Sequence, residues 1–260
     1  MSSDSYRQGL MATISDANAD TDSDGIIDGI EFVDGTDPNT RDNDIDNVNH
    51  LFVKQVLRDM LGEYWSYPQI NAALTTLQNS SSKAAMLLQY LNEPRFKTAR
   101  GAIIRLYIGF FQRRTDHAGL MYWIDRNETD MSLIDIARVF SASSEFQTLY
   151  GTLEDGAFVD LVYQNVLGRP ADSDGRDHWL SQLTAGAERG YVMAAFSESP
   201  ENQARHVNNV IPTLLYSLLL QRGITHDEFV ARFAELNSGA TAEAMIEAIL
   251  NSNEYRGRFY

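Results

Sequence analysis

The chain has 260 residues, of which 43% are hydrophobic, and a formal net charge of −15. This apolar content is that of a globular protein, and the excess of carboxylates argues against a nucleic-acid partner, which requires clustered Lys and Arg. Because cysteine is absent, disulfides, thiolate metal sites and cysteine nucleophiles are excluded. We also expect no transmembrane segment, since no apolar run approaches the roughly 18–20 residues that a membrane helix needs.

The negative charge is concentrated at the start of the chain. Residues 1–50 hold eleven Asp and Glu31 against Arg7 and Arg41, a net charge of −10, which leaves only −5 for the rest of the chain. The first six residues lack the basic and then apolar pattern of a signal peptide, so no export signal is predicted there. We divide this part into a flanking segment, residues 1–15, and an acidic segment, residues 16–47.

Residues 20–31 carry an oxygen ligand at every position that a twelve-residue calcium loop uses. Calcium takes six to eight oxygens at about 2.3–2.6 Å, supplied from loop positions 1, 3, 5, 7, 9 and 12, with a glycine at position 6. Gly25 occupies that sixth position. The predicted ligands are Asp20, Asp22, Asp24, the carbonyl of Ile26, Asp28 (directly or through water) and Glu31. A solvated linker has no reason to place both Gly25 and Glu31 where they stand, so we predict a Ca2+ site.

Further carboxylates flank this loop at the same spacing. The weaker candidate ligands are Asp16, Asn18, Asp42, Asp44 and Asp46. Asp42, Asp44 and Asp46 restart the ligand pattern, but Asn47 replaces the glycine that a second loop needs. The alternative of a second, weaker or shared ion therefore stays open. An acidic calcium site of modest affinity is useful mainly where calcium is plentiful, which favours a location outside the cell.

Residues 48–260 contain four copies of one repeat. Residues 106–113 align with residues 162–169 at an offset of 56, and the match continues to Trp123 and Trp179. A third copy begins at Tyr216, and a degenerate first copy precedes these. The predicted repeats span about residues 48–99, 100–152, 153–208 and 209–260, and each ends in a related closing phrase, such as residues 198–202.

The apolar spacing inside a repeat is helical. Phe158, Leu161, Val162 and Val166 follow the three-and-four spacing of a buried helix face, and the alternation of a strand is absent. Helix starts are expected at Asp172 and Ser199, and helix ends at Gly168 and Gly186. We therefore predict an all-α fold, a tandem array of about four three-helix repeats preceded by the acidic calcium-binding segment.

Two columns of the repeat hold opposite charges 32 residues apart. The pairs are Arg113 and Glu145, Arg169 and Glu201, Arg222 and Glu254, and, with the charges exchanged, Glu63 and Arg95. Charges that change sign together indicate contact, so we predict four structural ion pairs. The alternative is that each charge only complements the dipole of its own helix, but this would leave Glu63 and Arg95 misplaced.

The sequence offers no catalytic centre. The five histidines show no ligand or catalytic spacing, and no serine nucleophile elbow is present, so we expect the protein not to be an enzyme. Trp123 and Trp179 share one repeat column, which favours packing in the core of each repeat over a sugar-binding platform. Residues 172–175 look like half a calcium loop, but a helix cap is the better explanation.

The acidic segment and the repeats each resemble a known family. Residues 22–32, followed by residues 35–39 and a further run of alternating Asp, resemble a bacterial thrombospondin type 3 calcium repeat over residues 16–47. Residues 161–172 with Gly175 and Trp179, then residues 196–201, resemble the domain-of-unknown-function family numbered 4214. The second resemblance implies an all-helical module of large secreted or surface-attached bacterial proteins, often beside calcium repeats, with no known catalytic residues.

These observations together predict a calcium-binding structural or adhesive module, extracellular or on the cell surface. Its expected partner is a glycan, a matrix component or another protein surface. The alternative is a carbohydrate-binding or accessory domain of a secreted carbohydrate-active enzyme. Exposed, coplanar aromatic rings in a groove would favour that alternative, whereas buried rings favour a scaffold.

Overall fold

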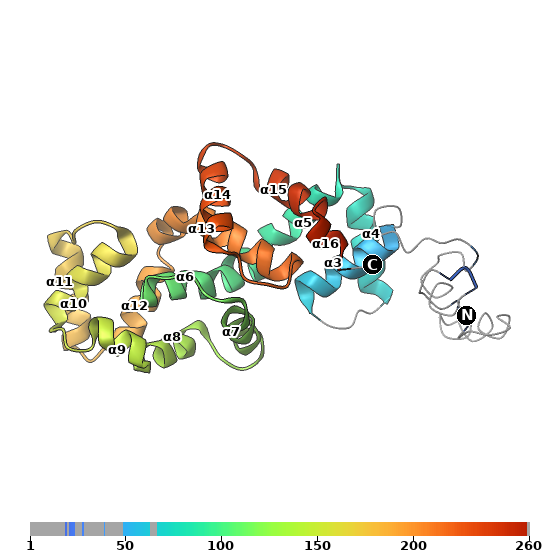
Figure 1. The fold of residues 1–260 in the computed structure, drawn as a ribbon. Coiled ribbons are helices and arrows are strands. Elements are labelled where there is room, and N and C mark those ends of the chain that lie inside the picture. Colours follow the sequence, from blue (N-terminus) through green and yellow to red (C-terminus); the bar gives the residue numbers. More distant parts are fainter. Residues whose placement is uncertain are drawn as a thin grey trace. The chain divides into compact units, whose positions relative to one another are not determined.

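The computed structural model describes residues 19, 21–23, 28, 39, 49–62 and 67–258 (Figure 1). In this part of the chain the backbone forms α-helices and two short π-helices, and no strand. The predicted all-α fold is therefore confirmed. The chain divides into two compact units, a smaller unit of residues 1–87 and 247–260 and a larger unit of residues 88–246.

The smaller unit combines segments from both halves of the sequence. Its helices are α3 (Asn49–Leu61), α4 (Tyr67–Gln78), the first half of α5 (Lys83–Asn92), the end of α15 (Ala242–Leu250) and α16 (Asn253–Arg256). The inner face of α3 follows the helical period, and Phe52, Val56 and Met60 on it are buried. Tyr255 of α16 is also buried.

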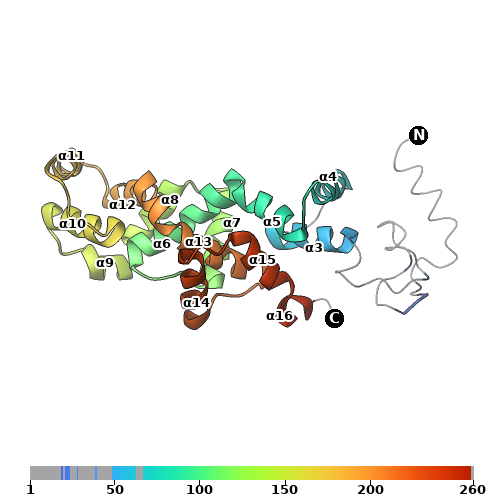
Figure 2. The ribbon, with the colours of Figure 1, turned by 90° about the horizontal axis from the view of Figure 1, so that it is seen from above.

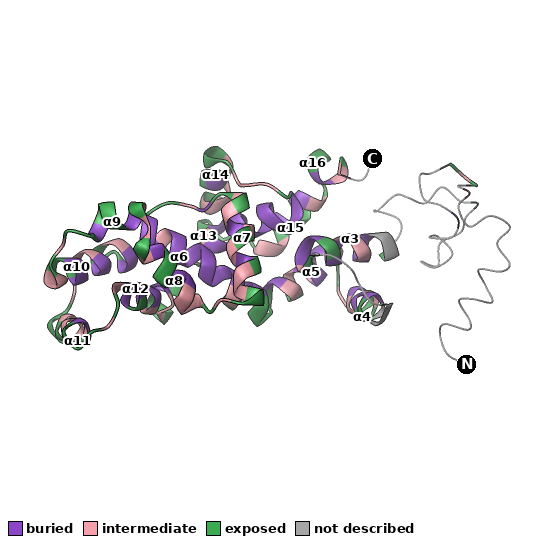
Figure 3. Ribbon diagram, turned by 90° about the horizontal axis from the view of Figure 1, so that it is seen from below, coloured by how far each residue is buried: buried purple, intermediate pink, exposed green. Residues whose placement is uncertain are grey.

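The larger unit is built around α6. Its elements are η1 (Arg95–Arg100), α6 (Gly101–Phe111), α7 (His117–Thr129), α8 (Leu133–Ala142), α9 (Ser144–Tyr150), α10 (Asp155–Val162), η2 (Tyr163–Leu167), α11 (Ser173–Thr184), α12 (Arg189–Ser197), α13 (Pro200–Leu219) and α14 (His226–Asn237). Every residue of α6 except Ile108 is buried, because α8, α12 and α13 pack around it (Figure 3). Helices α10 and α11 lie side by side at one end of this unit (Figure 2). Residues 214–219 are buried along the end of α13.

The closing phrases of the last three repeats each begin a new helix with a serine cap, whereas η1 in the first repeat follows Pro94 and has no side-chain cap. Ser143 accepts a hydrogen bond from the backbone N–H of Phe146 at 3.2 Å, and Ser199 accepts one from that of Asn202 at 3.2 Å. Ser252 does the same at the start of α16. The second repeat thus holds three longer helices, α6, α7 and α8, and then the short α9, where the sequence predicted about three.

The first helix of every repeat ends on a residue in the left-handed conformation. The φ angles are 89° at Gly62, 54° at Gln112, 71° at Gly168 and 54° at Gln221. Glycine adopts this conformation freely, whereas glutamine does so at a cost. The side chain of Gln112 offsets that cost by donating to the carbonyl oxygens of Ile108 and Gly109 at 2.9 and 3.1 Å. The helix end predicted at Gly168 is confirmed, whereas the helix ends at Gln112 and Gln221 were not predicted.

Candidate functional site

The described part of the acidic segment is held together by Asp28. Its backbone N–H donates to the carbonyl oxygen of Ala19 at 2.7 Å. Its carboxylate accepts two hydrogen bonds from Thr21, one from the backbone N–H at 2.8 Å and one from the hydroxyl at 2.6 Å. These bonds from Thr21 hold the pKa of Asp28 below its ordinary range. Positions 2 and 9 of the predicted calcium loop are therefore in direct contact.

Most of the predicted calcium ligands lie outside the described residues. Only Asp22 and Asp28 are described; the others, Asp16, Asn18, Asp20, Asp24, Ile26, Glu31, Asp42, Asp44 and Asp46, are not. Within the described ranges no three His, Asp or Glu side chains form a metal-binding group. The described groups that could bind a metal ion are the carboxylates of Asp22 and Asp28 and the carbonyl of Ala19. All of them offer oxygen, the ligand type that calcium prefers. The calcium site stays a prediction.

A cluster of three aromatic rings is repeated in the larger unit. Tyr107, Trp123 and Phe140 form the first cluster, in which the ring of Phe140 lies 5.0 Å from that of Tyr107 and 5.2 Å from that of Trp123. The second cluster, each member 56 residues further on, is Tyr163, Trp179 and Phe196. We call these the aromatic clusters. Burial raises the pKa of Tyr107, and a hydrogen bond with Trp123 opposes the rise. The tyrosines and phenylalanines of both clusters are buried, whereas Trp123 and Trp179 are of intermediate exposure, so the tryptophans pack at the edge of the core.

A capping aspartate and a glycine lock each cluster to the start of the next helix. Asp116 accepts a hydrogen bond from the backbone N–H of Gly119 at 2.8 Å, and Asp172 accepts one from that of Gly175 at 2.9 Å. A Cβ atom at Gly119 would lie 2.8 Å from the hydroxyl of Tyr107, and one at Gly175 would collide with the corresponding tyrosine. The glycine column therefore makes room for the tyrosine. The segment that looks like half a calcium loop is a helix cap.

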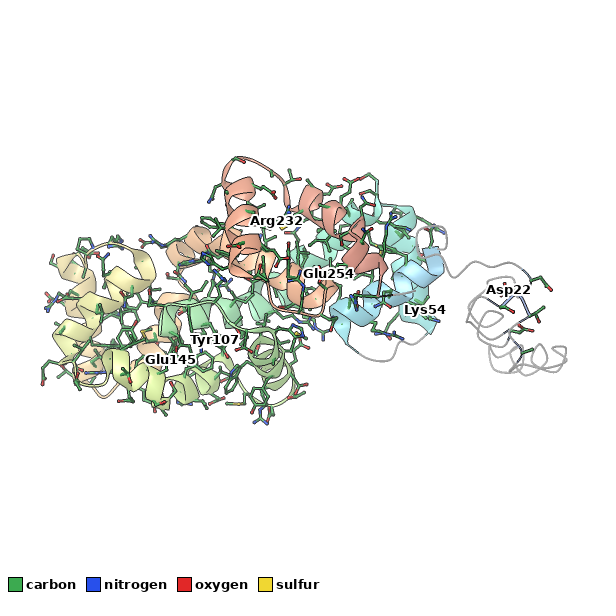
Figure 4. The ribbon with its side chains drawn as sticks, viewed as in Figure 1. Asp22, Lys54, Tyr107, Glu145, Arg232 and Glu254 are labelled. Carbon is green, nitrogen blue, oxygen red and sulfur yellow. The ribbon has the colours of Figure 1, made fainter. Side chains whose placement is uncertain are left out.

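Two of the predicted ion pairs are present beside these clusters. Arg113 donates to both carboxylate oxygens of Glu145 at 2.7 and 3.0 Å, and Arg169 donates to those of Glu201 at 2.7 and 2.9 Å. Each pair joins the end of the first helix of a repeat to its closing phrase (Tyr107 and Glu145 are labelled in Figure 4). The guanidinium of Arg113 also lies 5.4 Å from the ring of Tyr107. These hydrogen bonds hold the pKa of Glu145 and of Glu201 below the ordinary range.

The other two predicted pairs are not decided by the described residues. Arg222 donates to Glu228 at 2.9 and 2.7 Å, and Glu254 belongs to the other unit, whose position relative to this one is not determined. Glu63 lies outside the described residues. Its expected partner Arg95 donates to Glu128 at 3.1 and 2.7 Å. Both pairs therefore stay predictions.

The second cluster and its ion pair coincide with a known sequence family. Residues 137–206 match the family described as a domain of unknown function, DUF4214. The matched stretch runs from α8 into α13 and so contains all of Tyr163, Trp179 and Phe196, but only Phe140 of the first cluster. No curated protein and no solved structure matches the chain.

One salt bridge ties the DUF4214 segment to α6, and two others join η1 to α7. Arg105 on α6 donates to both oxygens of Glu198 at 2.7 and 2.6 Å, and its side chain is only 5% exposed. Glu128 receives hydrogen bonds from Arg95 and also from Arg100 at 2.8 Å. Burial raises the pKa of Glu128, but these hydrogen bonds outweigh it and lower the pKa to about 2. Sequence analysis missed these pairs because their partners recur in no column of the repeat.

The larger unit also contains a histidine whose pKa is lowered by burial. His206 lies on α13, its Nδ1 lies 3.3 Å from Oδ1 of Asn209, and burial is the main cause that lowers its pKa.

No helix within the described residues is both long and apolar enough to cross a membrane.

Proposed function

We propose that the protein is a calcium-binding structural or adhesive module that works outside the cell or on its surface. The observation that carries this proposal is the ligand set of residues 20–31, in which Asp28 and Thr21 already meet. Carboxylates this dense repel one another unless a cation offsets them. Calcium would supply this cation.

The helical part fits a scaffold that presents a surface. Arginines bridge distant parts of the larger unit, as Arg105 does to Glu198 and Arg169 to Glu201. Guanidinium and carboxylate groups that bond in two places hold a fixed geometry. In the DUF4214 segment, the side chains of Arg169, Glu198 and Glu201 are thus engaged in structural ion pairs. This supports a binding or structural role over a catalytic one.

The alternative, a carbohydrate-binding or accessory domain, needs a flat aromatic platform. Tyr122 is 54% exposed and its ring lies 4.9 Å from that of Trp123, but the two rings are inclined by 80°. The ring of His178 is inclined by 77° to that of Trp179. Perpendicular rings cannot stack on one sugar face together, so the geometry supports the scaffold. A glycan-array screen, run with calcium and with chelator, identifies a sugar partner if there is one.

Calorimetry on the whole chain tests the calcium proposal. We expect wild-type protein to bind calcium and the Asp24→Ala variant to lose the tightest site, because Asp24 is the predicted ligand at loop position 5. The matched control is Asp34→Ala, which removes an acidic residue from outside the ligand set. Unchanged binding in Asp24→Ala, or no binding in the wild type, would reject the proposal.

Calcium should stabilise the acidic segment and leave the helices nearly unchanged. A ligand that binds only the folded form adds RT ln(1 + [L]/Kd), and the cores of the helical units consist of apolar side chains and arginine pairs. We expect the segment of residues 16–47 to resist protease only with calcium. The thermal transition of the helices, followed by circular dichroism, should be the same with calcium and with chelator. A large shift of that transition would mean that the segment and the helices form one cooperative body.

A further inference from the structure

We propose that mild acid weakens the packing of α13 against α6 and η2 by placing a proton on His206. The inference goes beyond the proposed function and does not depend on the calcium loop, because every residue that carries it lies in the larger unit. It gives that unit a conformational response to pH, which a rigid scaffold does not need.

Helix α6 packs closely against its neighbours at two glycines. A Cβ atom on Gly101 would lie 3.3 Å from Cγ1 of Val210 on α13, and one on Gly109 would lie 2.6 Å from the hydroxyl of Ser197 on α12. The Ser197 hydroxyl and Oδ1 of Asn202 are buried without a hydrogen-bond partner. The contact therefore rests on close packing more than on polar bonds, and it leaves little room for a new charge and its solvent.

His206 lies on the face of α13 that is buried in this contact. Residues four apart share a face of a helix, and His206 stands four residues from both Asn202 and Val210, which are buried. Its Nδ1 lies 3.3 Å from Oδ1 of Asn209, an oxygen that can only accept, so Nδ1 carries the ring hydrogen. Its Nε2 is buried and has no hydrogen-bond partner. A second proton would therefore be taken up by Nε2, inside the packed contact.

Two arginines repel a charged His206 ring. Arg205 precedes it on α13, Arg105 is the only charged residue of α6, and both disfavour the imidazolium. Hydrogen bonds hold both guanidinium groups in place. Arg205 donates to the carbonyl oxygen of Leu167 at 2.9 Å, and Arg105 donates to both carboxylate oxygens of Glu198 at 2.7 and 2.6 Å. The charge of Glu198 is thus already compensated by Arg105.

The other elements that pack against α13 bring no free carboxylate to this ring. Element η2 has no charged side chain, and tyrosine is neutral in mild acid. The remaining charged or titratable groups on α12, α13 and α14 are Arg189, Glu201, His226, Asp227, Glu228, Arg232 and Glu235. All of them except His226 and Asp227 form ion pairs. These two lie at the start of α14, whereas Asn237 at its other end bonds at 2.9 Å to Asn208, two residues from His206.

The balance of these groups favours the neutral ring. Burial is the main cause that lowers the pKa of His206 below its ordinary value of 6.5. Asn209 and the backbone of Val166 oppose this shift, and the two arginines add to it. An unfolded or opened chain therefore takes up the proton first as the pH falls. Stability is independent of this group above pH 6.5 and decreases between pH 6.5 and the lower pKa of the packed form.

Titration of the full chain by NMR tests the first step. The carbon-bound protons of the His206 ring, assigned through the backbone, report its protonation. We expect the wild-type ring to titrate below pH 6.5. A His206 pKa at or above 6.5 would overturn the inference, whether or not any variant folds.

Hydrogen exchange of the full chain tests the second step. Wild type and His206→Gln are compared at pH 7.5 and at pH 5.5, so that the intrinsic effect of pH on exchange cancels in the ratio of their rates. This ratio should rise at pH 5.5 for the amides of α6 and α13, by at most about tenfold, and stay constant for those of α3.

Two further histidines provide the controls. His178 is exposed on α11, and His117 is a second histidine whose pKa is lowered by burial. The variants His178→Gln and His117→Gln should keep the wild-type response of α6 and α13. A ratio for His206→Gln that is equal at both pH values, or a response that disappears in His117→Gln instead, would overturn the inference.

Discussion

At the scale of single residues, arginine is the dominant cation of this chain. It has 18 Arg and only three Lys, Lys54, Lys83 and Lys97. The guanidinium group presents a planar fork that matches the two oxygens of a carboxylate, whereas an ammonium group is a single point of charge. Arg113 and Arg105 use this fork fully, and Arg113 also lies against an aromatic ring. The preference for arginine therefore follows from the geometry of the pairs.

The pair of Arg169 and Glu201 should show a measurable coupling energy. Both side chains are partly exposed, at 41% and 45%, so solvent screens the attraction and we expect a small, favourable coupling energy. A double-mutant cycle with Arg169→Ala and Glu201→Ala, measured by urea denaturation, gives this value. The control combines Glu201→Ala with Arg176→Ala, whose guanidinium bonds to Asp160, and should be additive. A coupling energy of zero between Arg169 and Glu201 would favour the alternative, in which each charge only complements the dipole of its own helix.

Glu128 should make stability depend on acid. Its pKa is about 2 in the folded protein and about 4.5 in an unfolded chain, so the unfolded chain takes up the proton first as the pH falls. The contribution of Glu128, up to about 3 kcal/mol, is complete above pH 4.5 and is lost between pH 4.5 and 2.

The variant Glu128→Gln isolates this contribution. It should be less stable than wild type at pH 7, and the difference between the two free energies of unfolding should shrink as the pH falls from 4.5 to 2. Urea denaturation at several pH values measures that difference. A difference that stays constant across this window would show that Arg95 and Arg100 do not stabilise the ionised form.

At the scale of the element, each first helix ends by the same device with different residues. Gly62 and Gly168 enter the left-handed region freely, while Gln112 and Gln221 enter it with a side-chain amide bonded to the last turn. The side chain of Gln112 donates to the carbonyls of Ile108 and Gly109 in the last turn, and its backbone N–H also donates to that of Ile108 at 3.0 Å. The backbone conformation at this repeat position is therefore left-handed in all four repeats, although the residue is glycine in two of them and glutamine in the other two.

Two substitutions at Gln112 should therefore have opposite outcomes. Gln112→Val places a β-branched side chain at a φ of 54° and removes the amide, so we expect a loss of about 2 kcal/mol or more in the free energy of unfolding. Gln112→Gly also removes the amide but relieves the backbone, and should stay within about 1 kcal/mol of wild type. Chemical denaturation measures both. Equal losses would mean that the side-chain bond, and not the backbone, sets the stability of this helix end.

Features that follow a local pattern or recur in the repeat could be predicted from the sequence, whereas contacts that occur only once could not. The helical period, the caps at Asp172 and Ser199, and the pairs at Arg113 and Arg169 all follow from local pattern or from an offset of 56 residues. The partners of Arg105 and Arg95 depend on packing between elements. A single sequence carries no local signal for such contacts. The calcium site rests on a local motif, and its described contact from Thr21 to Asp28 joins two positions that the motif treats as unrelated.

At the scale of the whole molecule, the smaller unit depends on a contact between residues 199 positions apart. Arg258 donates to both oxygens of Asp59 at 3.1 and 2.7 Å, and the Asp59 side chain has no exposed surface. Gln55 adds a hydrogen bond to the same carboxylate at 2.7 Å. Burial raises the pKa of Asp59, and Arg258 opposes the rise. The net direction shows that burying this carboxylate costs free energy even with its partner in place.

Removal of Arg258 alone should destabilise the smaller unit by about 3–5 kcal/mol, because Arg258→Met leaves Asp59 as a buried charge with one partner fewer. The double variant Asp59→Leu with Arg258→Met removes both charges and should recover most of the loss. Hydrogen exchange of the α3 amides reports on this unit separately from the larger one. Fast exchange in the double variant as well would mean that the contact is needed for packing and not for its charge.

The composition of the smaller unit limits how an array of this kind can lengthen. A helix at one end of the repeat series, α3, shares its unit with residues from the other end, and α5 and α15 carry the chain between the two units. A gene duplication that adds a copy within residues 100–208 leaves both halves of the smaller unit in place. A copy inserted within α3 or α16 would interrupt that unit. Recombination is therefore expected to expand such a protein from its middle, with the outer repeats left to diverge.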